Sequence, residues 1–349
     1  MGMLADQVDY VIGVDTHRDS HSAAVCGPSG AVAAETTVPA DAFGYKRLLR
    51  FAREQAAGRR VWAIEGTGSF GAGLTTVLLE QGEWVVEVDR PARPARRNGA
   101  KSDELDAARA AREALSRPHL AQPRRRGDRE ALRVLLATRE SAIIARTKAI
   151  AQLKALIVNA PDTLRQQLRT LNSDKQLARC SHLRINAAHS TERRATIIAL
   201  RSTARRALAL ETEAAQLEAV LQPVVSELAP ALLAEPGVGV ITAAQLLSSW
   251  SHPGRFRSEA AFASLAGAAP IPASSGQLVR HRLNRGGDRQ LNRALHTIAL
   301  SRLAHHPETK RYAARRAVEG KTPREIKRCL KRHLARRLYR LLETQAITA

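Results

Sequence analysis

Residues 8–15 read VDYVIGVD, an alternating stretch that ends in a carboxylate. Apolar residues at every second position are typical of a half-buried β-strand, so we expect a strand over 8–14. Residues 22–26 and 31–38 have the same character, and the turn-forming sequence Gly-Pro-Ser-Gly at 27–30 separates them. The chain is therefore predicted to begin with a three-stranded meander, with Asp15 at the end of its first strand.

Helices and strands alternate after this meander. The apolar spacing predicts, in order, helix 41–57, strand 61–64, helix 74–80, strand 84–88 and helix 102–115. Three strands followed by helix, strand, helix, strand and helix is the order of the ribonuclease-H-like (RuvC-like) fold. We therefore expect an α/β domain of this kind over residues 1–116.

Four carboxylates occupy matching places in this expected fold. Asp15 ends the first strand and Glu65 directly follows the fourth, and these two strands are neighbours at the centre of such a sheet. Asp103 and Asp106 are three residues apart near the start of the last helix, so they share one of its faces. Converging carboxylates need a counter-charge, and ligation by oxygen atoms alone favours Mg²⁺ or Mn²⁺. The alternative is that Asp15 merely ends a strand and that the helix dipole favours the other two aspartates.

The middle of the chain is predicted to be helical. Residues 117–127 contain two prolines and a basic run, which is typical of a linker. Apolar residues at helical spacing then predict long helices within 128–228, the second of them over 191–220, with the polar region 172–190 before it. The pattern favours an antiparallel helical pair, and it would also suit a coiled-coil dimer arm.

The C-terminal region, residues 229–349, is expected to be mainly helical. Pro-Gly-Val-Gly at 236–239, followed by an apolar run, resembles a helix-hairpin-helix element. In such a turn Gly237 and Gly239 would allow a sharp bend and present N–H groups to a phosphate.

A Gly/Pro/Ser-rich loop over residues 267–287 follows a short predicted helix at 258–265. An apolar-striped helix is expected to start at Asp288. The last helix should begin at the capping box Thr-Pro-Arg-Glu, residues 322–325. Apolar residues then recur at every fourth position, and basic residues fill the other faces.

The net charge of +22 is unevenly distributed along the chain. Residues 1–90 hold 8 Lys/Arg against 12 Asp/Glu, whereas the remaining residues hold 47 against 21. A polyanion partner explains this division, because each basic side chain placed on a phosphate releases counterions. An anionic membrane surface is the alternative, but the basic helices lack the broad apolar faces that interfacial helices use.

The cysteines and the apolar stretches indicate a cytoplasmic location. Cys26, Cys180 and Cys329 are far apart and show neither a disulfide framework nor paired zinc-ligand spacing. No apolar stretch reaches the length needed to cross a bilayer, and the N-terminus does not resemble a secretory signal.

Several short strings then identify a family resemblance. They occur in the family's order, as GVDTHRDSH (13–21), IEGTGSFG (64–71), KSDELDA (101–107), PGVGVITA (236–243) and PIPASSGQ (270–277). By these strings the chain resembles the insertion-sequence transposases of family one-hundred-and-ten, which join a DEDD RuvC-like domain to a C-terminal domain that carries a serine. The resemblance extends from about residue 9 to residue 343.

The resemblance implies roles for residues at matching positions. The DEDD metal ligands would be Asp15, Glu65, Asp103 and Asp106. The family places a nucleophilic serine just before a glycine in the C-terminal loop, which here is Ser275, with Ser274 as the neighbouring alternative. By themselves, both serines would equally suit an ordinary flexible loop.

The resemblance also implies partners, and with them a bacterial cell and a location at the nucleoid. Members of this family act on donor and target DNA, are guided by a structured bridge RNA, and join the metal centre of one subunit to the serine of another within a tetramer assembled on DNA. Base pairing would then carry the choice of sequence. Arg280, Arg282 and Arg285 follow the serine and would neutralise developing charge or contact the phosphate backbone.

Alternative hypotheses about function explain fewer features of the sequence. His17 and His21 are four residues apart, but a zinc pair at that spacing needs a helix, and this segment is predicted to connect strands. An actin-like phosphotransferase would need a second Asp-Gly phosphate hairpin, which the sequence lacks. A RuvC-like junction endonuclease would not explain the basic C-terminal half. A nucleic-acid-binding protein without catalysis would not explain the four carboxylates.

Overall fold

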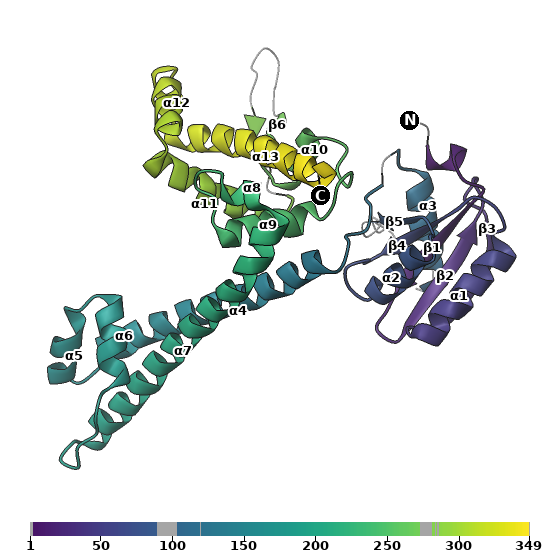
Figure 1. Ribbon diagram of the computed structural model, residues 1–349. Coiled ribbons are helices and arrows are strands. Elements are labelled where there is room, and N and C mark those ends of the chain that lie inside the picture. Colours follow the sequence, from purple (N-terminus) through teal and green to yellow (C-terminus); the bar gives the residue numbers. More distant parts are fainter. Residues whose placement is uncertain are drawn as a thin grey trace. The chain divides into compact units, whose positions relative to one another are not determined.

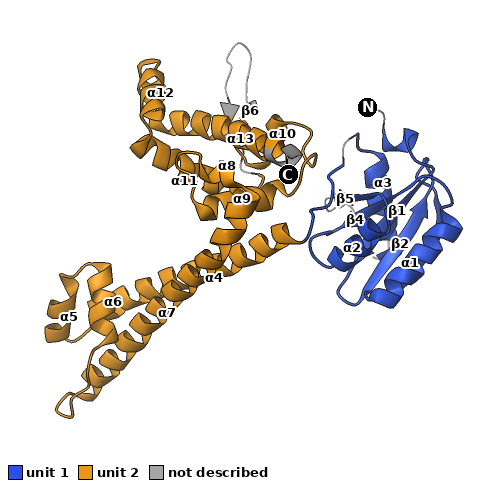
Figure 2. Ribbon diagram, in the orientation of Figure 1, with its two compact units in different colours: residues 1–126 blue, residues 127–349 orange. Residues whose placement is uncertain are grey.

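The computed structural model describes residues 3–88, 103–118, 120–272, 281–282, 284 and 286–348. The chain divides into two compact units, residues 1–126 and 127–349, which Figure 2 shows in different colours. The first is an α/β unit built on a five-stranded sheet, and the second is mostly helical. The predicted fold class is confirmed at this level. In the described part of the chain no helix is both long and apolar enough to cross a membrane.

The α/β unit follows the predicted element order. After a short 3-10 helix (Leu4–Asp6) its described elements are β1 (Tyr10–Thr16), β2 (Ser20–Cys26), β3 (Val32–Pro39), α1 (Ala42–Gln55), β4 (Arg60–Glu65), α2 (Ala72–Glu80), β5 (Val85–Val88) and α3 (Asp103–Leu115). The sheet order is β3-β2-β1-β4-β5. The first three strands are antiparallel, while β4 pairs in parallel with both β1 and β5. The predicted meander and the predicted contact of the first and fourth strands are both confirmed.

Different helices bury the two faces of this sheet. Ile12 and Val14 of β1 pack in one core with residues of α1 and α2, such as Leu48 and Leu74. Val11, on the opposite face of β1, packs in a second core with the alanines of α3. Because side chains alternate along a strand, every second residue of β1 and β4 faces α3.

The helical unit begins with a long arm. Its elements are α4 (Asp128–Val158), α5 (Asp162–Arg169), α6 (Ser173–Ser181) and α7 (Thr191–Leu228). Figure 1 shows α4 and α7 side by side along the arm, with α5 and α6 at its far end. The predicted pair of long helices is confirmed.

Two details of the arm differ from the sequence expectation. Helix α6 lies inside the region 172–190, which we expected only to separate the long helices. It forms because Asn172 caps its first turn and because Leu177 and Cys180 are buried. Helix α7 also continues beyond residue 220, with Pro223 inside it.

The rest of the helical unit surrounds a separate core. Its described elements are α8 (Pro230–Leu233), α9 (Val240–Trp250), α10 (Glu259–Leu265), β6 (Ile271–Pro272), β7 (His281–Arg282), α11 (Arg289–His305), α12 (Pro307–Val318) and α13 (Pro323–Thr348). Trp250, Phe262 and Leu295 belong to this core, which also receives the apolar face of α13. The predicted capping box is present, since the backbone N–H of Thr322 donates to Glu325 Oε2 at 2.8 Å.

Candidate active site

Asp15 and Glu65 lie at the carboxyl ends of two neighbouring strands. The parallel register of β1 and β4 pairs Val14 with Ile64, so the two acidic residues come next on their strands. By the alternation of side chains, both fall on the face that α3 covers. The Thr16 hydroxyl donates to the backbone oxygen of Glu65 at 2.9 Å, which ties the two strand ends together.

Helix α3 lies directly on β1 because the facing residues are small. A Cβ atom on Gly13 would lie 2.0 Å from the backbone oxygen of Ala107 and 2.6 Å from the backbone nitrogen of Ala111. Glycine alone permits this approach. Asp15 is two residues after Gly13 on the strand, and Asp103 is one turn before Ala107 on the helix. The close packing therefore brings the acidic start of α3 beside Asp15.

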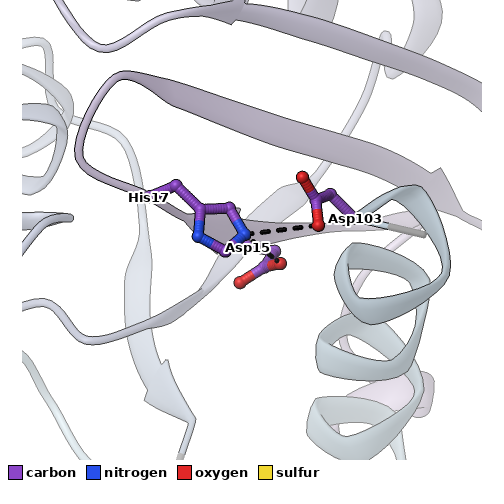
Figure 3. A group of neighbouring side chains, drawn as sticks. All are labelled: Asp15, His17 and Asp103. Carbon is purple, nitrogen blue, oxygen red and sulfur yellow. Dashed lines mark hydrogen bonds and ion pairs between the residues drawn. The ribbon is translucent and has the colours of Figure 1, made fainter. Parts of the chain in front are cut away.

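Asp15, His17 and Asp103 form a compact group, shown in Figure 3. One ligand atom from each lies within 4.8 Å of the others. His17 Nε2 is 3.1 Å from Asp15 Oδ2 and 3.4 Å from Asp103 Oδ1. The side chain of Asp15 is 13% exposed, whereas those of His17 and Asp103 are 43% and 44% exposed. Solvent and ions can therefore reach the group.

The surroundings of Asp15 disfavour the negative charge of its carboxyl group. Burial raises its pKa, His17 lowers it, and the carboxylates of Asp106 and Asp103 raise it. The net shift is upward. Arg109 supplies a cation to Asp106, to which its Nη1 donates a hydrogen bond. Two carboxylates beside an imidazole form a donor set that suits a divalent metal ion, whose charge would relieve this repulsion.

The structure brings together some of the predicted ligands. Asp15 and Asp103 belong to the compact group, and Asp106 acts on Asp15 through its charge. Glu65 ends the adjacent strand, but the group found among the described residues does not include it. His17 is a member that sequence reasoning did not assign. The signal was its position two residues after Asp15 and directly after the strand, because alternate residues of a strand share a face.

The disfavoured pairing of His17 with His21 is not formed. His21 is fully buried and stacks on Tyr45 of α1, with ring centroids 5.7 Å apart and planes within 5°. Burial lowers the pKa of His21, which keeps the imidazole neutral. Asp15 pairs with Ser22 across the hairpin, so His21, one residue earlier, points to the other face of the sheet. It is a core histidine.

The glycine turn of the C-terminal region lies between α8 and α9. Gly237 has φ +79°, and a Cβ atom there would lie 3.1 Å from the backbone oxygen of Ile298 in α11. The N–H of Gly239 donates to Thr242 Oγ1 at 3.0 Å. The N–H group of Gly239, one of the two expected to meet a phosphate, is therefore hydrogen-bonded within the chain. Gly237 allows the turn to lie close to α11.

Two short strands flank the segment that contains the predicted serine. β6 and β7 pair antiparallel, with Ile271 opposite Arg282. Arg282 is exposed. The predicted residues that lie outside the described part of the chain are Ser274, Ser275, Arg280 and Arg285. Their roles stay predictions.

Comparisons with known proteins match both halves of the chain. Residues 12–160 match a transposase family model of the IS110 DEDD type, and residues 229–314 match the model described as transposase IS116/IS110/IS902 family. The chain is 27% identical to an uncharacterized 42 kDa protein of insertion element IS900 from Mycobacterium paratuberculosis, over 96% of each chain. It is also 39% identical to an uncharacterized 43.6 kDa protein of insertion element IS110 from Streptomyces coelicolor, over 31% of this chain and 26% of the relative.

These matches confirm the resemblance that the sequence strings indicated. Transposases cut and rejoin DNA, and those of the DEDD type generally depend on a divalent metal ion. The two family models match different parts of the chain, and the IS900 relative aligns with nearly all of it. The chain therefore belongs to the IS110 family of insertion-element transposases.

Proposed function

We propose that the chain is a metal-dependent DNA recombinase that cuts and rejoins strands to move an insertion sequence. The observation that carries this proposal is the convergence of Asp15 and Asp103, from a strand end and a helix start, into a group that an ion can reach. The strand order β3-β2-β1-β4-β5 supports assigning the α/β unit to the ribonuclease-H-like fold. Acidic residues at these strand ends and on the covering helix are then the natural metal ligands.

The proposed metal centre consists of Asp15, Glu65, Asp103 and Asp106. Glu65 is included because it ends the strand beside Asp15 on the same face of the sheet. Mg²⁺ or Mn²⁺ is the proposed ion, since carboxylate oxygens are the ligands these ions prefer. Such an ion would supply positive charge to the phosphate oxygens at the reacting phosphorus. His17 would help hold Asp15 and Asp103 in place, because its Nε2 lies between their carboxylates.

The proposed nucleophile is Ser275, with Ser274 as the alternative. Its Oγ would bond to a DNA phosphorus while the bond from that phosphorus to a strand oxygen breaks, and the serine proton would end on the released oxygen. Attack by another strand's hydroxyl on the serine–phosphate ester would reverse the exchange and rejoin DNA without ATP. Arg280, Arg282 and Arg285 would neutralise the charge that develops. The family model over residues 229–314 includes this segment, which supports the assignment.

Partners follow from the charge and from the family. Residues 127–349 hold 37 Lys/Arg against 17 Asp/Glu, which suits a polyanionic partner. We propose that a bridge RNA guides the protein to donor and target DNA. A dimer would form through the helical arm as a coiled coil, and a tetramer would assemble on DNA. The metal centre of one subunit would then act with the serine of another.

Replacing each serine by alanine tests which of the two is the nucleophile. Ser275→Ala should abolish strand exchange and leave nucleic-acid binding intact, whereas Ser274→Ala, the matched control, should keep most of the activity. Full strand exchange by the Ser275→Ala variant would rule out Ser275 as the nucleophile. If that variant still cut DNA in a metal-dependent way without rejoining it, a junction endonuclease would be the better description.

The guide and the metal are tested separately. Protein purified from its host should carry one discrete RNA species, and nuclease treatment should stop recombination until that RNA is restored. Asp103→Asn should lose metal-dependent activity, with Asp19→Asn as an exposed control carboxylate in the same unit. If the protein recombined DNA normally without the RNA, the RNA proposal would be wrong, and the proposal of a metal centre would be unaffected.

A further inference from the structure

The helical arm carries its charges in two blocks. We define its base as residues 128–147 and 207–228, and its tip as residues 148–206, which include α5 and α6. The base holds 4 Lys/Arg against 7 Asp/Glu, whereas the tip holds 12 against 3. A single arm is therefore mildly acidic at its base and strongly basic at its tip.

The ion pairs follow the same division. Every arginine of the base has a carboxylate partner, in the pairs Arg129–Glu130, Arg133–Glu130, Arg139–Glu218 and Arg146–Glu211. Among the twelve cations of the tip, only Arg165 has a carboxylate partner within the described residues, Asp162. The base neutralises its cations internally, and the tip does not.

Four tip arginines serve the fold through neutral groups. Arg201 and Arg205 donate to backbone oxygens at the end of α6, those of Leu183 and Ser181. Arg193 and Arg206 donate to the side chains of Thr163 and Gln152. Seven exposed cations then have no ion-pair or hydrogen-bond partner in the described part of the chain: Lys148, Lys154, Arg169, Lys175, Arg179, Arg184 and Arg194.

A packed scaffold presents these cations. Leu153, Leu164, Leu168 and Leu177 are at most 2% exposed and belong to a core that joins α4, α5, α6 and α7. The side chain of Gln176 also donates to the backbone oxygen of Leu168, which links α6 to α5. Lys175 and Arg179 are four residues apart on α6, and Arg165 and Arg169 are four apart on α5, so each pair shares a helix face. The tip is therefore a small folded module with exposed positive charge.

We propose that the tip of the arm binds the phosphate backbone of a nucleic acid. Unpaired like charges on a compact module repel one another, and a polyanion would offset that repulsion and release counterions. The proposal rests on the proposed function only in taking nucleic acid as the partner of this chain. It assigns the contact to residues of the arm, which belong neither to the serine segment nor to the carboxylate group.

A second copy of the chain fits this surface less well. The acidic base of another arm would be the complementary partner, but four of its seven carboxylates are already paired. These are Glu130, Glu140, Glu211 and Glu218. The other three could not balance a tip whose cations exceed its acids by nine.

An anionic membrane also fits less well than a nucleic acid. The large apolar side chains exposed at the tip are single residues on separate segments, namely Val158, Ile185 and Ile198. They do not form the broad apolar face that an interfacial helix inserts.

Two matched triple variants of the full-length protein test the proposal. The tip variant carries Arg169→Gln, Lys175→Gln and Arg179→Gln, and the base variant carries Arg133→Gln, Arg139→Gln and Arg146→Gln. Both lose three positive charges. Binding to a mixed-sequence DNA duplex and to a structured hairpin RNA is measured across a range of salt concentrations.

The tip variant should bind at least one probe roughly tenfold more weakly, and its plot of log affinity against log salt for duplex DNA should be shallower by about 2.7. The base variant should stay within about twofold of the parent protein. The probe that loses affinity identifies the source of the phosphate. A third variant, Arg169→Lys with Arg179→Lys, keeps the charge and should keep the binding. Circular dichroism checks that all of them fold.

Several results would overturn the assignment. Equal losses in both triple variants would mean that only total charge matters. A tip variant with normal nucleic-acid binding, but with weaker self-association or weaker binding to phosphatidylserine vesicles, would assign the tip to another partner. If that variant still recombined, the proposed function would stand and this inference would fall. A parent protein that bound neither probe would contradict both.

Discussion

The two compact units use their acidic residues in opposite ways. In the helical unit Glu235 is 8% exposed and lies between Arg302, at 3.4 Å, and Arg337, at 2.8 Å. In the α/β unit Asp15 and Asp103 lie together beside one imidazole. Yet the helical unit holds 37 Lys/Arg against 17 Asp/Glu, and the α/β unit holds 18 against 16. The local arrangement, and not the total charge of a unit, therefore distinguishes an acidic residue enclosed by arginines from acidic residues that lie beside one another.

An acidic residue of the fold and an acidic residue of a binding site differ in the charges that surround them. A carboxylate enclosed by arginines has its charge satisfied within the chain, and burial then makes the pair part of the fold. Carboxylates that repel each other cost stability, and a chain tolerates that cost where a ligand from outside offsets it. The raised pKa of Asp15 and the lowered pKa of Glu235 express this contrast.

The largest expected effect comes from neutralising one acid in each unit. Glu235→Gln leaves Arg302, which is 9% exposed, without its charge partner, and should cost about 3–5 kcal/mol of stability. Asp103→Asn should change the stability of the metal-free protein by less than about 1 kcal/mol, since its side chain is half-exposed. Hydrogen exchange, which follows each unit separately, measures both. Equal losses would remove the contrast between the units.

Glycine substitutions should show the next largest difference. Gly13→Ala places a Cβ atom against the backbone of α3 and should cost about 1–3 kcal/mol or more, because neither β1 nor the helix can yield easily. It should also weaken metal binding, since the helix carries Asp103. Gly239→Ala is the matched control, because a Cβ atom there meets no described atom within 4 Å. Thermal unfolding and Mn²⁺ titration measure the two effects, and a tolerated Gly13→Ala would contradict the packing argument.

Acidification should affect the helical unit through Glu235. Burial alone would raise the pKa of Glu235, but the hydrogen bonds and charges of Arg337 and Arg302 outweigh it and lower the pKa. A carboxyl group with a lowered pKa in the folded state adds stability above its unfolded pKa, and this is lost as the pH falls through the folded value. Chemical denaturation as a function of pH should therefore show a steeper acid loss in the parent protein than in Glu235→Gln. If both proteins lost stability equally at low pH, the ionised Glu235 carboxylate and its arginines would not contribute to stability.

The smallest expected effect concerns His17. His17→Ala should weaken Mn²⁺ binding roughly tenfold, because Asp15 and Asp103 lose the imidazole between them. Arg18→Ala is the control, since Arg18 is 81% exposed and pairs only with Asp19 among the described residues. Calorimetric titration at constant pH measures the affinity. An unchanged affinity in His17→Ala would limit its role to the metal-free protein.

Much of the α/β unit could be predicted because its signals are local. The alternation over residues 8–14, the turn at 27–30 and the acidic start of α3 each lie within one element. The strand order then follows from the known order of such elements. The sequence also predicted the two long arm helices, but it missed α6, whose short apolar stripe is clear only against the core it enters.

The sequence by itself determined that Asp15 lies near the end of a strand, that Asp103 and Asp106 lie in the first turn of a helix, and that basic residues prevail after residue 90. These features depend on spacing and composition, which are properties of neighbours along the chain. Only the tertiary structure decided that His17 lies beside the carboxylates of Asp15 and Asp103, and that α3 packs closely against β1 at Gly13. It alone also showed that the arginines of the arm's base are paired while most cations of its tip are not. Those outcomes depend on distances between residues far apart in sequence, which packing alone sets.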